Sequence, residues 1–397
     1  MATQAPLNAV TSHRVTAVHA QDDTVAIPLQ DIVDEIGPPI AENGAVADVS
    51  DTFSNDNYAL LKERRVFSAL VPADLGGSGH SYAQMCAFLT SLAGYHPSTA
   101  LSCAMHQHVV AAQVYNHRHG KPGRALLEKV AVGELALVST GAGDWLASNG
   151  ELEKVDGGYR FTATKHFASG SPAADILATS APYNDPVEGW QVFHFPVSLK
   201  ADGVTVLDNW APMGMRGSGS NSVRIEKVFV PEASISGRRP RGDFHAMWCV
   251  VLPVALPLIM SVYRGIAEKA ARIARERCRD SVDPATPYLL GEMENALTTV
   301  QLAVDDMIRT VGDYSFVASP ETVDAIVRRK TIAAEAAKQT VMKALEACGG
   351  PGFMRANGLE CLLRDVMASH FHPLQEKRQL LFTGALAMGK EPPAQAF

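Results

Sequence analysis

The hydrophobic pattern of this chain changes its period twice, and this change constrains the possible fold more than any other feature. Up to about residue 134, apolar residues recur at helical spacing, as in the run ALLKERRVFSALVP that ends at Pro72. From about residue 135, short alternating runs such as WQVFHFPV are separated by Gly, Pro, Asn and Asp. Four long helical segments follow. The sequence therefore predicts an α+β chain in three parts.

These parts are an N-terminal helical domain at 1–134, an antiparallel β-domain at 135–237 and a C-terminal four-helix bundle at 238–397. The VDGGY segment indicates a hairpin within the β-domain. Apolar stripes over helices of about 25 residues are typical of a bundle. The charged segment from Arg238 to Asp243 is expected to form a solvated hinge between the last two domains.

Charge and composition argue against several classes of partner. The formal net charge is −7 and no basic run is long enough to follow a phosphate backbone. The longest apolar stretch, from Met247 to Met260, is interrupted by Pro253 and Pro257 and is shorter than the ~18 residues of a membrane span. The start MATQAPLNAVTSHR lacks a secretory pattern, and the six cysteines form no CxxC pair. We therefore expect a cytoplasmic protein with reduced cysteines and without nucleic-acid, membrane or metal partners.

Five motifs, in this order, resemble the acyl-CoA dehydrogenase superfamily over nearly the whole chain. They are LVPADLGGSGHS, ALVSTGAGDWL, KHFASGSPAAD, MGMRGSGSNSVRIEKVFVPEASI and EACGGPGFMRANGLECLLRD. The resemblance implies a helical domain, a β-domain and a four-helix bundle that together form a flavin-dependent oxidoreductase. It implies FAD or FMN as the cofactor, and a homotetramer in which a neighbouring subunit completes each flavin site.

Several positions match the flavin contacts of that family. Phe167 takes the place of the Trp beside the flavin ring, and Ser169 that of a Thr. Hydroxyls and backbone donors suit the polar edge of the ring, and a flat apolar side chain suits its face. The glycines of GGPG would let backbone amides approach a pyrophosphate, although such residues also end helices. The cofactor candidates are Ser139, Thr140, Phe167, Ala168, Ser169, Gly349, Gly350 and Gly352.

The sequence lacks the carboxylate base of an acyl-CoA dehydrogenase, which removes the α-proton of the substrate. In the commonest arrangement a Glu follows the Arg-Asp pair by about eight residues. Counted from Arg364-Asp365, that position is Pro373, and Glu376 lies three residues later. The other family position, on the first bundle helix near LPVALPLI, has no carboxylate either. The base is therefore missing or displaced.

The residue beside the vacant base position, His372, resembles a branch of this fold exemplified by dibenzothiophene monooxygenase and 4-hydroxyphenylacetate hydroxylase. In the dibenzothiophene enzyme a His lies eight residues after the same Arg, as His372 lies after Arg364. These enzymes take reduced flavin from a separate reductase and react with oxygen, so they need hydrogen-bond donors near the peroxide. A second donor is expected from only one of His106 and His108, since neighbours two apart do not share a helix face, and we favour His106.

The loop RGSGSN adds the candidates Ser218, Ser220 and Asn221 for contact with the flavin edge or the substrate, with Arg216 as a possible anchor. Three hypotheses remain. The first is a two-component monooxygenase that binds reduced flavin and oxidises a small aromatic, sulfur- or nitrogen-containing substrate. The second is an acyl-CoA dehydrogenase with its base displaced to Glu376. The third is a non-catalytic paralogue, against which the retained flavin motifs argue.

Overall fold

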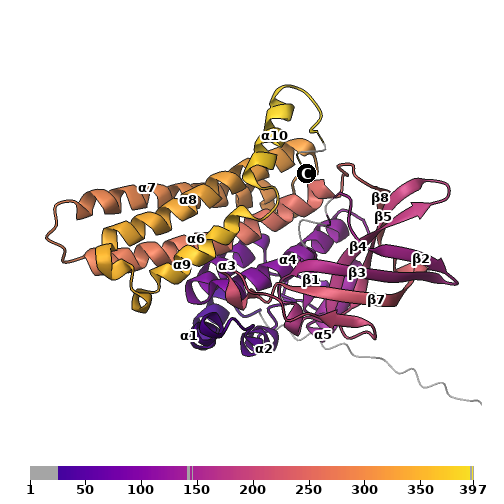
Figure 1. The fold of residues 1–397 in the computed structure, drawn as a ribbon, viewed down its shortest axis with the longest axis horizontal. Coiled ribbons are helices and arrows are strands. Elements are labelled where there is room, and N and C mark those ends of the chain that lie inside the picture. The colour runs from indigo at the N-terminus through magenta and orange to yellow at the C-terminus, as the bar shows by residue number, and fades with distance from the viewer. Residues whose placement is uncertain (1–25, 141–143, 145, 394–395, 397) are drawn as a thin grey trace, which may run out of the picture.

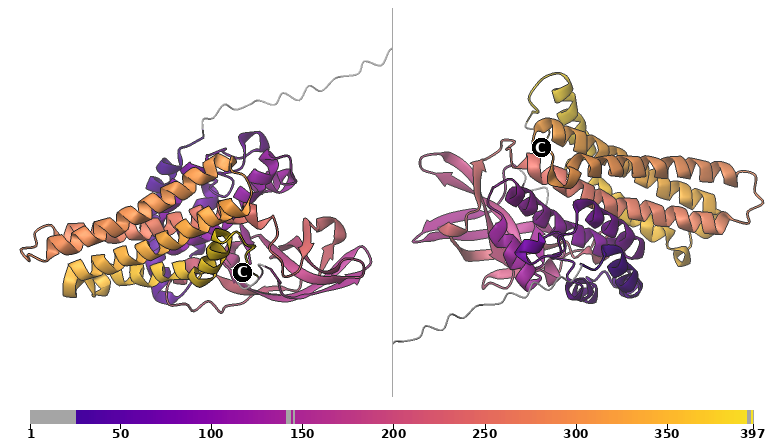
Figure 2. Two further views of the ribbon diagram at one scale, coloured as in Figure 1. Left: turned by 90° about the horizontal axis from the view of Figure 1, so that it is seen from above. Right: turned by 180° about the vertical axis from the view of Figure 1, so that it is seen from behind.

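The computed structural model describes residues 26–140, 144, 146–393 and 396. The N-terminal stretch MATQAPLNAVTSHR and residues 141–143 and 145 of the ALVSTGAGDWL motif lie outside the described residues. Figure 1 shows helices, then strands, then helices along the chain, with the strands at one end of the molecule and a long helical bundle extending from the other. The views in Figure 2 keep the same separation. The predicted order of helices, strands and helices is confirmed.

The N-terminal part is helical and largely buried. Side-chain caps fix two of its helix starts, because Ser54 accepts from the amide of Asn57, and Ser81 forms a capping box with Gln84. The fourth helix begins at Pro97, which suits the first turn. The helices are α1 (Leu29–Ser50), α2 (Asn55–Glu63), α3 (Tyr82–Tyr95), α4 (Pro97–Arg118) and α5 (Arg124–Gly133).

The central part contains two four-stranded sheets, ordered β1-β4-β5-β8 and β2-β3-β7-β6. The predicted hairpin is present, since Val155 pairs with Gly158 across the turn between β2 and β3. The strands are not all antiparallel as predicted, because β1 pairs with β4 in parallel. Their bounds are β1 (Leu137–Ser139), β2 (Glu151–Val155), β3 (Gly158–Ala168), β4 (Ile176–Asp185), β5 (Gly189–Ser198), β6 (Val204–Val206), β7 (Asn221–Pro231) and β8 (Gly237–Pro240).

The C-terminal helices pack around α6, which also contacts α3 and α4 of the N-terminal part. This helix is long and apolar enough to cross a membrane, but 89% of its most apolar window is buried inside the protein, as in a core helix. Pro253 and Pro257 were expected to interrupt the segment, yet both lie inside the helix. The helices are α6 (Trp248–Cys278), α7 (Thr286–Val311), α8 (Pro320–Gly352), α9 (Leu359–Val366) and α10 (Glu376–Ala387).

The segment expected to be a solvated hinge is instead part of a sheet. Residues Gly237 to Pro240 form β8, in which Arg239 faces inward and is only 1% exposed. Its guanidinium donates to Nε2 of His194 at 3.0 Å and to the carbonyl of Leu146 at 2.6 Å. Buried cations require such partners. The connection between the sheets and the bundle is therefore fixed where β8 ends.

Candidate functional site

His372 lies between α9 and α10 in a segment held by two bundle helices. Its Nε2 is 2.6 Å from the hydroxyl of Tyr263 on α6. Nζ of Lys330 on α8 donates to the carbonyls of His372, at 3.0 Å, and of Leu374, at 3.2 Å. Burial lowers the pKa of His372 to about 3, and the charge of Lys330 and the ring of His108 act in the same direction. The imidazole is therefore neutral at physiological pH.

His108, on α4, faces the end of β1. Its Nε2 lies 3.2 Å from the hydroxyl of Ser139, and burial lowers its pKa to about 4. Its Nδ1 is buried without a hydrogen-bond partner among the described residues. The carbonyls of Ala104 and Met105 on the same helix face the ring and oppose the effect of burial on its pKa, so this nitrogen meets the helix backbone without a well-formed hydrogen bond. His108 and His372 are near enough to influence each other electrostatically.

His106, the histidine favoured by the sequence analysis, occupies a different environment. Its Nδ1 accepts from the amide of Leu137 at 2.9 Å, and its Nε2 bonds the carbonyl of Phe67 at 2.8 Å. Both ring nitrogens are therefore engaged with the backbone, and no donor is left for a substrate or cofactor. This corrects the expectation for His106 and makes His108 the candidate on α4. Sequence periodicity limited the choice to one of the two but did not show which helix face meets β1.

Three of the predicted flavin-edge hydroxyls form a continuous chain. The hydroxyl of Ser220 lies 2.8 Å from those of both Ser169 and Ser218. Ala168, directly before Ser169, is buried where β3 pairs with Asn221 of β7. The side-chain amide of Asn221 donates to the carbonyl of Leu207, which uses one of its two N–H donors. The serine chain is consequently the polar part of this cluster.

A pocket of about 250 Å³ opens beside the serine chain. Phe167 is 57% exposed on its wall, and its φ of 60° is unusual for an aromatic residue. The ring of Trp210 meets Phe167 edge to face, with centroids 6.2 Å apart. Trp210 was not identified from the sequence, because it lies just outside the motif that begins at Met213. The pocket is lined by His166, Phe167, Asn209, Trp210, Ala211, Pro212, Ser220 and Ser222.

The residues around this pocket fit part of a flavin. Two aromatic rings offer flat apolar surface, and hydroxyl, amide and imidazole groups supply donors and acceptors for a polar edge. Its volume of about 250 Å³ lies just below the ~300–1,000 Å³ usual for small-molecule sites. The pocket is therefore too small for a whole flavin, and a complete flavin site here would need further walls.

Thr140 belongs to the anchored base of the loop that follows β1. Its hydroxyl donates to the carboxylate of Asp144 and lies 3.5 Å from that of Thr179. Asp144 also pairs with Nζ of Lys165 at 2.8 Å, and Lys165 is only 1% exposed. The hydroxyl of Thr140 is thus committed to this ion pair, while the neighbouring Ser139 remains next to His108.

The predicted glycine candidates are not brought to the same place. Gly349, Gly350 and Gly352 lie at the C-terminal end of α8, far from the strands that carry Phe167 and Ser169 (Figure 1). Around Gly349 and Gly350 an added Cβ would meet nothing within 4 Å in the same chain. Within one chain these glycines therefore cannot join the pocket beside Phe167.

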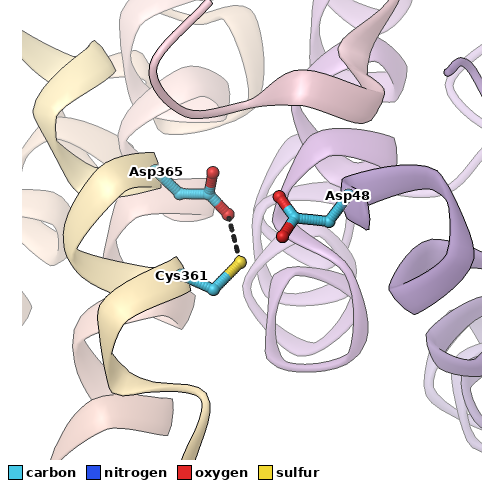
Figure 3. Close-up of side chains that lie close together, drawn as sticks. All are labelled: Asp48, Cys361 and Asp365. Carbon is cyan, nitrogen blue, oxygen red and sulfur yellow. Dashed lines mark hydrogen bonds between the residues drawn. The ribbon is translucent and has the colours of Figure 1, made fainter. Parts of the chain in front are cut away.

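A separate cluster joins Asp48 of α1 to Cys361 and Asp365 of α9 (Figure 3). Their ligand atoms lie within 4.8 Å of one another, a spacing that would suit a metal ion. However, Asp48 pairs with Arg364 at 2.8 Å, and Asp365 accepts the amide of Met215. Burial, as the largest cause, raises the pKa of Asp365 to about 6. Since the arginine already supplies positive charge, the cluster acts as a junction between α1, α9 and the loop before β7.

The anchor suggested for the RGSGSN loop lies at the same junction. Nε of Arg216 is 3.2 Å from the carboxylate of Asp51, and one of its terminal nitrogens donates to the carbonyl of Asp48. These contacts fix the loop that carries Ser218 and Ser220 against α1. The serine chain is therefore positioned by the N-terminal helices as well as by its own sheet.

The arrangement offers neutral hydrogen-bond donors rather than a base. His108, Ser139, Tyr263 and His372 line the junction of α4, β1, α6 and the segment before α10. Among the described residues, no carboxylate hydrogen-bonds to any of these four. Glu376, the displaced base of the second hypothesis, pairs with Lys377 at 3.2 Å on the surface. Tyr263 and Lys330 were not identified from the sequence, because no motif marks them.

Comparison with protein-family models gives two matches in this chain. The N-terminal domain of acyl-CoA dehydrogenases matches residues 30–134, and the C-terminal domain of acyl-CoA dehydrogenases matches residues 261–376. Together the two matches cover most of the helical residues that precede and follow the strands along the chain.

Curated relatives span more than one reaction. An amino sugar nitrososynthase of Streptomyces peucetius is 25% identical over 91% of this chain and 93% of its own length. The oxygenase component of p-hydroxyphenylacetate 3-hydroxylase of Acinetobacter baumannii is 24% identical over 96% of this chain and 93% of its own. A mitochondrial isovaleryl-CoA dehydrogenase of Oryza sativa subsp. japonica is 26% identical over 82% of each chain. All three are oxidoreductases.

Solved structures share the fold over nearly the whole chain. The nitrososynthase of Micromonospora carbonacea var. africana superposes with a TM-score of 0.83 at 26% identity, covering 91% of this chain and 96% of that one. An FMN-bound structure of TdsC from Paenibacillus sp. A11-2 gives a TM-score of 0.79 at 17% identity, covering 92% and 98%. The predicted architecture of a helical domain, a β-domain and a helical bundle is confirmed.

Proposed function

Because the chain belongs to the acyl-CoA dehydrogenase superfamily of flavin-dependent oxidoreductases, we propose that it is a two-component monooxygenase of that superfamily. It would receive reduced flavin from a separate reductase and oxidise a small organic substrate. One atom of oxygen enters the substrate, and the other leaves as water with the two electrons and two protons of the reduced flavin. Bound reduced flavin supplies the electrons that activate oxygen.

The observation that carries this proposal is that His372, eight residues after Arg364, is a neutral imidazole close to a second neutral imidazole, His108. Burial keeps the pKa of His372 at about 3 and that of His108 at about 4, so neither ring is protonated at neutral pH. A neutral imidazole presents one N–H donor, which can stabilise a developing oxygen anion by a hydrogen bond. Acyl-CoA dehydrogenases use a carboxylate as the α-proton base, and no carboxylate hydrogen-bonds to this cluster among the described residues.

The flavin is proposed to lie against Phe167 and Trp210, with its polar edge toward the serine chain of Ser169, Ser218 and Ser220. Thr140 is not needed for this flavin position, because its hydroxyl donates to the carboxylate of Asp144. An FMN-bound structure of this fold supports a flavin at this position. The glycines at the end of α8 would contact the cofactor of a neighbouring subunit in a homotetramer.

The relatives favour two forms of the substrate class. Amino sugar nitrososynthases and a phenol hydroxylase component both align over more than four fifths of this chain. A small substrate with an amine, sulfur or aromatic group therefore fits the proposal. Isovaleryl-CoA dehydrogenases align over a similar length, so α,β-dehydrogenation of an acyl thioester is the second candidate.

The test is to load the protein anaerobically with reduced FMN or FAD, mix it with oxygen, and record oxygen and hydrogen peroxide together. We expect oxygen to be consumed before peroxide appears, because hydrogen bonds from the imidazole donors retain the reduced oxygen at the site. His372→Gln should shorten this lag about tenfold while flavin remains bound. Glu376→Gln is the matched control and should leave the lag unchanged.

A different set of results would identify an acyl-CoA dehydrogenase. In that case bound oxidised flavin would bleach on addition of isovaleryl-CoA, peroxide would appear without a lag, and Glu376→Gln would abolish the bleaching. That result would replace the monooxygenase proposal with the second candidate.

A further inference from the structure

Two buried residues that no sequence motif marks hold His372 in place. Tyr263 reaches its Nε2 from α6, at 2.6 Å. Lys330 reaches the backbone on both sides of Pro373 from α8, through the carbonyls of His372 and Leu374. The ring and the segment that carries it are therefore fixed by different helices of the bundle.

The hydrogen bond between Tyr263 and His372 has a defined direction. Burial raises the pKa of Tyr263 well above its usual value, so the phenol keeps its proton. Among the described residues, the only hydrogen-bond partner of this hydroxyl is Nε2 of His372. If Nε2 carried the imidazole proton, the phenol proton would have no acceptor. The phenol therefore donates to Nε2, and the proton of the neutral imidazole lies on Nδ1.

Nδ1 of His372 is thus the donor that remains available. It has no hydrogen-bond partner within the described part of the chain, and the side chain is only half-buried. If the proposed function holds, this N–H would donate a hydrogen bond to the reacting oxygen. The tautomer matters, because with the proton on Nε2 the exposed nitrogen would only accept hydrogen bonds.

Lys330 is buried to 2% exposure, and no carboxylate of the described residues forms an ion pair with it. Burial, as the largest cause, lowers its pKa to about 8. A buried ammonium with only carbonyl partners is costly to a fold. Its retention is explained if the segment between α9 and α10 must be held in one geometry.

We propose that Tyr263 is a positioning residue, which sets His372 in the Nδ1–H tautomer and leaves that N–H free for the reaction, while Lys330 anchors the backbone around it. This rests on the proposed function for its role in oxygen chemistry, but the tautomer can be tested independently of any reaction.

The first measurement is solid-state ¹⁵N NMR of the full-length protein labelled at histidine, with His372→Gln used to assign the signals of this ring. We expect a protonated Nδ1 and an unprotonated Nε2. In Tyr263→Phe the Nε2 signal should change toward a mixture of tautomers. The lag between oxygen consumption and peroxide release should shorten about three- to tenfold, as for loss of one hydrogen bond.

Tyr82→Phe is the matched control, because it removes another buried hydroxyl, which donates to the carbonyl of Val254 at 2.7 Å. It should leave both the His372 signals and the lag unchanged. A protonated Nε2 in the native protein, or signals that do not change in Tyr263→Phe, would overturn the inference. A protonated Nδ1 without any lag in the native protein would instead support the tautomer assignment and refute the proposed function.

Discussion

At the scale of single residues, the two histidines of α4 show what a sequence can and cannot determine. Their separation by two positions implies that they face different surroundings. Which of them meets the site depends on the position of β1, which pairs with a strand almost 40 residues later. His106 therefore bonds the amide of Leu137 and the carbonyl of Phe67, whereas His108 reaches Ser139.

Replacement by leucine should mainly reduce stability at His106 and mainly affect the oxygen reaction at His108. His106→Leu leaves a buried amide and a buried carbonyl unpaired, which we expect to lower the free energy of unfolding by about 2–4 kcal/mol. His108→Leu frees only the hydroxyl of Ser139, so stability should change by less than about 1 kcal/mol. It should nevertheless shorten the lag between oxygen consumption and peroxide release about tenfold. Urea unfolding and the oxygen assay check both; equal stability losses would contradict this assignment.

At the scale of elements, β8 shows how a charged segment can become part of a core. Its register with β5 pairs Val192 with Arg239 and Phe193 with Arg238, so the two arginines face opposite sides. The inward guanidinium of Arg239 reaches the carbonyls of Leu146 and Asp144 as well as Nε2 of His194. The strand thereby holds the backbone at Asp144 and Leu146.

We expect Arg239→Met to loosen that segment. The substitution keeps most of the side-chain length but leaves buried carbonyls without a donor. Amide hydrogen exchange should increase in the peptide that carries Asp144 and Leu146, and affinity for reduced flavin should fall about tenfold. Arg238→Met, on the outward face of the same strand, is the control and should change neither. Unchanged exchange in Arg239→Met would show that β8 does not fix the segment.

The elements also show why the sequence predicted the architecture better than its details. Helical and alternating periods are local properties, and they correctly separated the helical parts from the sheets. The parallel pairing of the three-residue strand β1 depends on a distant partner. The helix α6 continues through Pro253 and Pro257 because surrounding helices bury it, which offsets the ~3 kcal/mol that a proline costs inside a helix.

At the scale of the whole molecule, the candidate cofactor residues lie at opposite ends of one chain. Phe167 belongs to β3 and Ser169 directly follows it, whereas the glycines that end α8 lie at the far end of the bundle (Figure 1). Beside those glycines, Phe353 and Met354 are 82% and 62% exposed. Exposed apolar side chains of this kind are typical of contact surfaces between subunits. Both observations are explained if a second copy brings its own GGPG segment to the pocket.

A bulky side chain at Gly350 should separate assembly from folding. Since an added Cβ there meets nothing within 4 Å of its own chain, Gly350→Trp should leave helix content and thermal stability unchanged. If a partner's pocket lies against this glycine, affinity for reduced flavin should fall about tenfold or more. Gly384→Trp on α10, which also has open space around it, is the control and should bind flavin normally. Native affinity in Gly350→Trp would mean that one chain holds the whole cofactor.

Mixed assemblies of two variants test directly whether a second chain contributes its GGPG segment to the flavin site. A Phe167→Asp chain would lack the pocket wall but keep an intact GGPG segment, and a Gly350→Trp chain would have the reverse. If each site combines the strands of one chain with the end of α8 of another, a mixed assembly contains some sites in which both halves are intact. Flavin binding should then recover when the two inactive variants are refolded together. If every site were built within a single chain, no mixture of the two could restore it.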